Sequence, residues 1–399
     1  MSTVPSITDV DVAGKTVLVR ADLNVPMDNG RVTDAARIER FAPTAAYLAD
    51  KGARVVIISH FGRPKGIRMP AMSLEPIAKA LAKNLEREVG FAEECVGEVA
   101  EKAVWDMRDG DIVMLENLRF QAAETENSNT FAQRLAVFSD LYVNDAFSCS
   151  HRAHASTQAI TKLLPSYAGL SLKGELDALD GVLGTPQRPI AALVGGAKVS
   201  TKITVLEALI PTMDAIIVGG GMANTFLLAK GVPIGNSLAE PDYVDTAKQI
   251  MAVAAENDCE IVLPVDLVVS EEFAAGAANE VVLVGTDPGD RMILDVGPAS
   301  ITDLTARLGD LKTLLWNGPL GAFEIDPFGD GTFAVAKAAA DLTKQGKLVT
   351  VAGGGDTVAA LNQAGVSDDF TYISTAGGAF LEWLEGKELP GVAALTNQD

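Results

Sequence analysis

Four short stretches in the second half of the chain combine an apolar run, a cluster of glycines and a helix-like segment. The clusters are Gly195-Gly196, Gly219-Gly220-Gly221, Gly353-Gly354-Gly355 and Gly377-Gly378. A strand that ends in glycines at a helix start exposes backbone N–H groups, and the helix dipole favours an anion there. Together the four stretches predict one nucleotide site built from several loops. Each cluster alone is as typical of a tight strand-to-helix turn.

Arginines in the first half lie near predicted strand ends or helix starts, and most directly follow an apolar strand. They are Arg20, Arg37, Arg63, Arg119 and Arg152. In open α/β sheets the carboxyl ends of the strands line the ligand crevice, and guanidinium groups bind carboxylates and phosphates through paired hydrogen bonds. The set predicts a site for an anion such as a phosphorylated acid. For any single arginine, ordinary surface ion pairing is the alternative.

Two polar residues, Asp22 and Asn24, lie beside the first of these arginines. They are two positions apart in an extended segment, so both side chains can face the same way. We expect them to add hydroxyl and carboxylate recognition, which makes the first half an anionic-substrate site and the second half a nucleotide site.

Composition restricts the possible partners. The 399 residues carry 32 basic and 53 acidic side chains, for a net charge of −21, which argues against nucleic acid or an anionic membrane as a general partner. No apolar run approaches the roughly 18 residues needed to span a bilayer, and residues 1–10 lack the features of a signal peptide. The three scattered cysteines predict buried thiols in a reducing cytoplasm. His151 and His154 lack a third ligand, so we expect no zinc site.

Apolar strands alternate with amphipathic helices along most of the chain. In the first half, strands are expected at 16–21, 54–59, 111–115 and 141–143, with helices at 34–49 and 74–88. In the second half, strands are expected near 190–194, 214–218, 260–264, 313–316, 347–351 and 371–373. The alternation is typical of a parallel sheet covered by helices on both faces. A helix at 171–183 that ends in a Gly-Thr-Pro breaker indicates the boundary between two such α/β domains.

At this point the residues resemble one family, phosphoglycerate kinase. The matching stretches follow the order of the family and span nearly the whole chain: Val19–Pro26, Ser59–Pro64, Leu115–Phe120, Asn144–Phe147, His151–Ser156, Gly195–Lys202, Gly219–Phe226, Trp316–Pro319, Gly353–Thr357 and Ser374–Ala379. The chain departs from the commoner pattern at Phe61, Ser148-Cys149-Ser150, Ala299 and Ala376, and none of these removes an expected catalytic side chain.

The resemblance implies reversible phosphoryl transfer between 1,3-bisphosphoglycerate and ADP, giving 3-phosphoglycerate and ATP. By motif, the phosphoglycerate would be held by Asp22, Asn24, Arg37, His60, Arg63, Arg119 and Arg152. The nucleotide would be surrounded by Lys198, Lys202, Gly219, Asn317, Glu324, Gly353, Gly354, Gly355, Asp356 and Thr357. Arg37, Lys202, Gly354 and Gly377 are the expected catalytic groups, and Asp356 is the expected Mg²⁺ ligand.

The implied fold consists of two Rossmann-like domains, each a parallel sheet with helices on both faces. The expected bounds are 1–170 for the phosphoglycerate domain, 171–188 for a helical hinge and 189–375 for the nucleotide domain, with 376–399 returning to the first domain. Direct in-line transfer with hinge closure is expected, in a monomer that acts on small molecules in the cytoplasm.

The expected chemistry agrees with the residues present. The acceptor carboxylate is already ionised at neutral pH, so no general base is required, and positioning and charge neutralisation remain. Two alternatives stay open. A dinucleotide-dependent oxidoreductase requires a GxGxxG motif directly after a strand, and this sequence has none. A two-lobed anion-binding protein without enzymatic activity would explain the arginines. It would not explain why Lys198, Lys202 and Asp356 lie beside glycine loops.

Overall fold

The computed structural model describes residues 4–184, 186–374 and 376–396. The chain divides into two compact units, one formed by residues 1–177 and 388–399 and the other by residues 178–387. The division falls inside α6 (Leu170–Leu183). The predicted domain bounds stay a prediction, and Thr375, the expected end of the second domain, lies outside the described residues. Among the described residues, no helix is both long enough and apolar enough to cross a bilayer.

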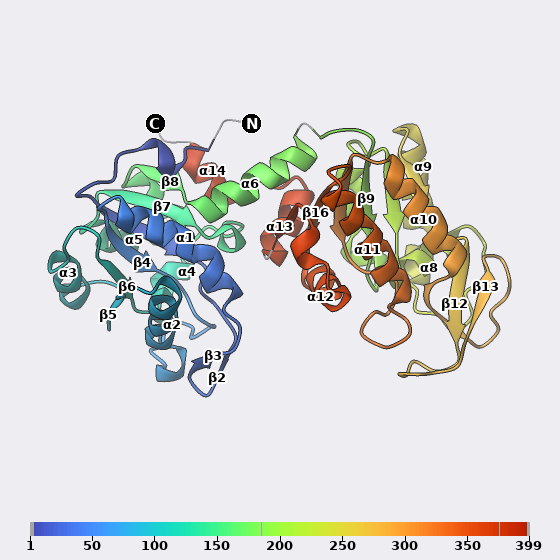
Figure 1. Ribbon diagram of the computed structural model, residues 1–399, viewed down its shortest axis with the longest axis horizontal. Coiled ribbons are helices and arrows are strands. Elements are labelled where there is room, and N and C mark those ends of the chain that lie inside the picture. The colour runs from blue at the N-terminus through green and yellow to red at the C-terminus, as the bar shows by residue number, and fades with distance from the viewer. Residues whose placement is uncertain (1–3, 185, 375, 397–399) are drawn as a thin grey trace. The chain divides into compact units, whose positions relative to one another are not determined.

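The first unit contains a six-stranded parallel sheet flanked by helices (Figure 1). In spatial order the strands are β5 (Gly90–Ala92), β6 (Ile112–Leu115), β4 (Arg54–Ile58), β1 (Thr16–Ala21), β7 (Leu141–Asp145) and β8 (Ser166–Ala168). The helices are α1 (Ala36–Asp50), α2 (Glu75–Leu85), α3 (Glu98–Trp105), α4 (Ala122–Thr125), α5 (Asn129–Ala136) and α14 (Pro390–Thr396), and a short hairpin joins β2 (Met27–Asp28) to β3 (Arg31–Val32). Every residue of β1 is buried, as expected for a central strand covered on both faces.

The second unit repeats the scheme with the strand order β11 (Glu260–Val262), β10 (Ala215–Val218), β9 (Ile190–Val194), β15 (Thr313–Asn317), β16 (Val349–Gly353) and β17 (Tyr372–Ser374), all parallel. Its helices are α7 (Ile203–Leu209), α8 (Gly220–Ala229), α9 (Val244–Glu256), α10 (Pro298–Asp310), α11 (Asp330–Lys344), α12 (Gly355–Ala364) and α13 (Gly377–Leu384). The sequence did not predict an added antiparallel sheet of β12 (Asp266–Ser270), β13 (Asn279–Leu283) and β14 (Met292–Val296), in the order β13-β12-β14.

Both parallel sheets reverse their strand order beside their first strand. In the first unit the chain adds β4 and β6 on one side of β1 and later β7 on the other, and in the second it adds β10 and β15 on opposite sides of β9. Such a reversal opens a crevice at the carboxyl ends of the two central strands. The topology therefore places one candidate site after β1 and β7 and another after β9 and β15.

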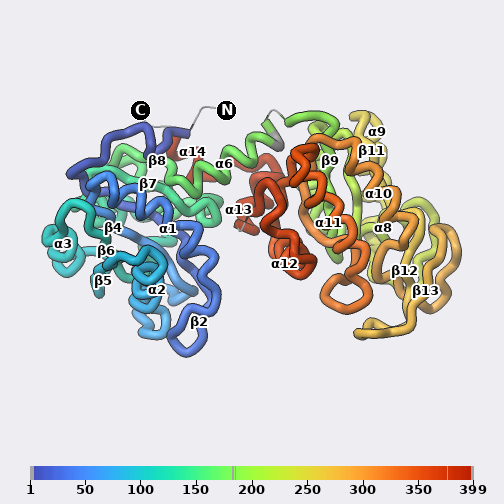
Figure 2. Tube along the Cα trace, viewed as in Figure 1, coloured from blue at the N-terminus to red at the C-terminus, as the bar shows by residue number. Residues whose placement is uncertain are grey.

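The C-terminal helix belongs to the first unit although it follows the whole second unit in sequence. Figure 2 shows this red segment beside the green β8 strand, which α14 contacts. The N–H of Gly391 donates to the carbonyl of Ser150 (2.8 Å), and Asn144 Nδ2 donates to the carbonyl of Gly391 (3.1 Å). These bonds attach α14 to the loop after β7.

A buried carboxyl group joins β7 to the start of α6. Asp145 Oδ1 accepts the N–H of Leu172 (2.9 Å), and burial raises the pKa of Asp145 from its ordinary 3.8 to about 6. The folded state therefore binds this proton more tightly than the unfolded state, so the contribution of Asp145 to stability falls as pH rises from about 4 to about 6.

The Asp145→Asn substitution removes this titration and retains an oxygen acceptor. We expect the stability of the wild type relative to the variant to increase by about 2 kcal/mol between pH 7.5 and pH 4.5. Urea unfolding at the two pH values measures this difference, with the exposed Asp109→Asn as the matched control. If the stability difference between the wild type and the variant is the same at both pH values, the raised pKa assigned to Asp145 is contradicted.

Candidate active site

The first candidate site begins where β1 ends. Asp22 Oδ2 is 2.7 Å from Nη1 of Arg37, which lies in the first turn of α1, and the Ser148 hydroxyl donates to the same carboxylate. Arg37 also donates to the carbonyl of Asn24 (3.1 Å), and Asn24 Oδ1 accepts the N–H of Gly62 (2.9 Å). The structure thus joins three of the predicted substrate residues, Asp22, Asn24 and Arg37, in one hydrogen-bonded group.

The remaining predicted arginines line a cationic pocket of the same unit. Arg63, Arg119 and Arg152 surround a cavity of about 340 Å³. Arg119 Nη1 donates to the carbonyl of Gly62 (2.7 Å), which fixes the guanidinium at the wall, and burial together with Arg20 lowers the pKa of Arg119. Three cations around a small cavity suit a phosphate or carboxylate.

Sequence reasoning missed several residues of this pocket. Lys65, Gln121 and His154 also line it. Lys65 follows the predicted Arg63 by two positions, and His154 lies in the same motif as Arg152, so their proximity in sequence was the available signal. Burial, with the surrounding arginines, lowers the pKa of His154 to about 4, so this ring is neutral at pH 7.

Arg20 differs from the other four arginines because it is buried, with 1% of its surface exposed. Its Nη2 donates to His60 Nδ1 (3.0 Å) and lies 3.6 Å from Cys149 Sγ. The interpretation of the arginines as one anion-contacting set therefore needs a correction: Arg20 contacts protein groups, and it does not line the cavity.

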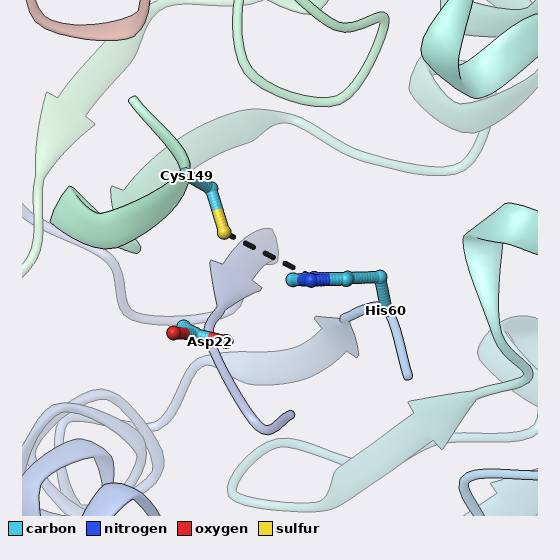
Figure 3. Close-up of side chains that lie close together, drawn as sticks. All are labelled: Asp22, His60 and Cys149. Carbon is cyan, nitrogen blue, oxygen red and sulfur yellow. Dashed lines mark hydrogen bonds between the residues drawn. The ribbon is translucent and has the colours of Figure 1, made fainter. Parts of the chain in front are cut away.

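Three potential ligand atoms gather around the end of Arg20. Figure 3 shows the thiol of Cys149 directed toward the His60 ring, with Asp22 beside them. One ligand atom from each residue lies within 4.8 Å of the others, a spacing that suits a metal ion. Arg20 donates hydrogen bonds to two of these atoms, His60 Nδ1 and Cys149 Sγ, and its positive charge opposes a cation. We therefore interpret the group as a hydrogen-bonded cluster.

The second candidate site lies where β9 and β15 end. Gly195 donates its N–H to the carbonyl of Asn317 (3.0 Å), and a Cβ at Gly195 would overlap the carbonyl of Pro319. Gly318 has a φ of +115°, a conformation that favours glycine. The close approach of the two loops explains why this part of the motif needs glycine.

An amide side chain connects three parts of the second site. The ammonium of Lys202 donates to Asn317 Oδ1, and Asn317 Nδ2 donates to the carbonyl of Gly353 (2.7 Å). Thr357 Oγ1 accepts the N–H of Gly318 (2.7 Å). Burial lowers the pKa of Lys202, while Asp356 opposes the shift. Asn317 and Thr357 therefore position a half-buried lysine beside the start of α12.

Two helices begin at this edge, and at the start of α8 the N–H groups of Gly219, Gly220 and Met222 already donate to backbone carbonyls. Gly219 is the residue before α8, and Gly354 is the residue before α12, with a φ of +100°. Gly353 and Gly355 flank it. The amino ends of helices attract anions, so the glycine loop before α12 suits a phosphate group.

A cavity of about 390 Å³ adjoins these loops. Glu324 and Asp356 line it, together with the glycines 196, 220 and 221. Glu324 and Asp356 are the predicted nucleotide residues that line this cavity. The predicted residues that are not among its lining residues are Lys198, Lys202, Gly219, Asn317, Gly353, Gly354, Gly355, Thr357 and Gly377. Of these, Lys198 is exposed and Gly377 begins α13.

Sequence reasoning also missed the apolar part of the second cavity. Leu238, Phe273 and Met292 lie on its wall. Asp295 lines it as well, and burial raises the pKa of this carboxyl to about 7. The apolar side chains of this wall suit the flat face of a nucleotide base. No motif identifies these residues, because they come from separate loops and from β14.

The predicted metal ligand can be tested against the chemistry of its position. Asp356 is an exposed carboxylate in the first turn of α12 and lines the cavity beside the glycine loops. Mg²⁺ prefers one or two carboxylate oxygens, phosphate oxygens and retained waters. The position therefore fits a Mg²⁺ ion that arrives with a nucleotide.

Comparison with known proteins assigns the chain to a class and then to a family. Residues 7–387 match the family described as Phosphoglycerate kinase. A phosphoglycerate kinase of Agrobacterium fabrum is 59% identical over 386 residues, which cover 97% of this chain and 96% of that protein. The structure is similar to phosphoglycerate kinase from Coxiella burnetii (TM-score 0.93, 40% identity, 99% and 100% of the two chains). It is also similar to the enzyme from Pyrococcus horikoshii OT3 (TM-score 0.81, 31% identity, 98% of each chain).

These likenesses place the chain among the kinases that transfer a phosphoryl group to a carboxyl group. The chain belongs to the phosphoglycerate kinase family. The predicted family, kinase function and α/β fold class are therefore confirmed.

Proposed function

We propose that this protein catalyses reversible phosphoryl transfer between 1,3-bisphosphoglycerate and ADP, giving 3-phosphoglycerate and ATP. The observation that carries the proposal is the pair of complementary sites, a cationic pocket in one unit and a glycine-lined cavity in the other. A phosphorylated acid matches the first site, and a nucleotide with its phosphates matches the second.

In the proposed reaction the two sites position the substrates and neutralise the negative charge of the transferred group. The carboxylate of 3-phosphoglycerate is ionised at neutral pH, so it needs no base to attack ATP. The transferred group needs cations and N–H donors around it. We assign Arg37 and Lys202 as the cations, and the N–H groups near Gly354 and Gly377 as the donors.

The remaining assignments follow the same division. Phosphoglycerate is held by Asp22, Asn24, Arg37, His60, Arg63, Arg119 and Arg152. The nucleotide is surrounded by Lys198, Lys202, Gly219, Asn317, Glu324, Gly353, Gly354, Gly355, Asp356 and Thr357. Asp356 holds the Mg²⁺ ion, which neutralises phosphate charge when bound. We further propose a monomer that works in the cytoplasm.

Direct transfer requires the two substrates to meet. We therefore propose hinge closure about residues 171–188, which excludes water from the reaction. Small-angle scattering is expected to show a smaller radius of gyration with both substrates bound than with either one. An unchanged radius would contradict closure.

A coupled assay of ATP-dependent 3-phosphoglycerate phosphorylation tests the function. We expect turnover that disappears with a chelator and returns with Mg²⁺. Absence of turnover, together with absence of Mg-ADP binding in calorimetry, would instead support an anion-binding protein without kinase activity.

A further inference from the structure

One buried arginine has no place in the proposed catalytic set. Arg20, at the end of β1, is 1% exposed, and its guanidinium is directed at protein acceptors. Its Nε donates to Ser156 Oγ (2.9 Å), its Nη1 to the carbonyl of Ala21, and its Nη2 to His60 Nδ1 (3.0 Å). A buried guanidinium is costly unless its N–H groups are bonded in this way.

The bond to His60 determines where the imidazole carries its hydrogen. Arginine has donors and no acceptor, so His60 Nδ1 must accept through its lone pair. His60 is 7% exposed, and burial together with the positive charges of Arg20, Arg119 and Arg37 lowers the pKa of this imidazole well below 6.5. A neutral ring with an unprotonated Nδ1 carries its hydrogen on Nε2.

A buried carboxyl group in α4 fixes Ser156, the residue that accepts the hydrogen bond from Arg20 Nε. Glu124 in α4 is fully buried, and its carboxylate accepts both the Ser156 hydroxyl (2.6 Å) and the Ser156 N–H (3.0 Å). The Tyr142 hydroxyl donates to the carbonyl of Ser156 (2.6 Å). The Ser156 hydroxyl therefore links the buried Glu124 carboxyl group to the buried guanidinium of Arg20.

We propose that Arg20 is a positioning residue that holds His60 as the neutral Nε2–H tautomer through the Glu124–Ser156–Arg20 line. His60 is not among the residues that line the cationic cavity. In the proposed function it contacts phosphoglycerate, and the fixed tautomer then gives it one directional N–H donor toward that substrate. The inference rests on the proposed function for its kinetic consequence, and the tautomer itself does not depend on that function.

The tautomer can be observed directly by nitrogen NMR of the ¹⁵N-labelled protein. The chain has only three histidines, so the His60→Gln variant assigns the His60 resonances by difference. We expect a pyridine-type Nδ1 and a pyrrole-type Nε2 with no titration between pH 6 and pH 8. A pyrrole-type Nδ1, or a mixture of tautomers in the wild type, would overturn the proposal without reference to activity.

A pair of variants separates the role of Arg20 from loss of the fold. Arg20→Met alone leaves Glu124 buried without its partner charge, so Arg20→Met is combined with Glu124→Gln, and Glu124→Gln alone is the control. We expect the control to retain the single tautomer. The double variant is expected to show mixed tautomers and a KM for 3-phosphoglycerate raised by about 10-fold to 100-fold, with a smaller change in kcat.

An unchanged tautomer in the folded double variant would overturn the role given to Arg20, because another group would then set the ring. Mixed tautomers with an unchanged KM would overturn the link to substrate binding. If neither the wild type nor the control turns over 3-phosphoglycerate, the proposed function fails, while the NMR result still decides the tautomer.

Discussion

Replacing Arg37 by alanine is expected to lower kcat for phosphorylation of 3-phosphoglycerate by about 10²-fold to 10³-fold, the loss seen when one charge-stabilising donor is removed from an active site. The Kd of Mg-ADP should stay unchanged, because Arg37 lies in the first unit with Asp22 (2.7 Å), while the nucleotide is assigned to the second. The coupled assay measures kcat, and calorimetry measures the Kd.

The matched control for this experiment is Arg31→Ala. Arg31 is an exposed arginine of β3, six positions away in the same unit, and has no assigned role. The control should retain wild-type kcat. A variant at position 37 with normal kcat and a raised KM for 3-phosphoglycerate would reduce Arg37 to a binding residue.

Replacing Lys202 by methionine should cause a loss of similar size in kcat. The substitution keeps an unbranched apolar stem and removes the ammonium that donates to Asn317. The proposed transition state spreads negative charge over the transferred group, so the lysine should stabilise it more than it stabilises bound ADP. We therefore expect kcat to fall by about 10²-fold or more and the Kd of Mg-ADP to rise less.

The exposed Lys230→Met is the control for the loss of one positive charge in the same unit. Equal losses in kcat and in nucleotide affinity at position 202 would contradict a transition-state role. Stopped-flow measurement of one turnover distinguishes a slow chemical step from slow product release.

Sequence patterns predicted most of the parallel strands because such strands are largely apolar runs, but they missed the three-residue outer strands β5 and β8 of the first sheet. The runs 16–21 and 190–194 are buried along their whole length. The antiparallel strand β13 was missed although its sequence contains the apolar run Val281-Val282-Leu283. Only Val282 of this strand is buried, so the run does not mark a central strand covered on both faces, which is the kind of strand that the strand–helix alternation predicts.

Site residues were predictable where a motif places them next to a strand end. Asp22 and Asn24 follow β1, and Asn317 ends β15. The separation of Arg20 from Arg37 was not predictable. The burial of Arg20 depends on Ser156, 136 positions away, and on Glu124 in α4. No local pattern reports such distant partners. The roles of the site residues stay predictions until the variants are measured.

The attachment of α14 to the loop after β7 affects how a ribosome makes this protein. Gly391 packs against Ser150 beside the Ser148 that donates to Asp22. Residues 178–387 leave the ribosome before α14 does. The surface of the first unit that α14 covers therefore stays exposed while the second unit is synthesised and begins to fold. The loop after β7, which carries Ser148, thus receives its contacts with α14 only after the whole second unit has been synthesised.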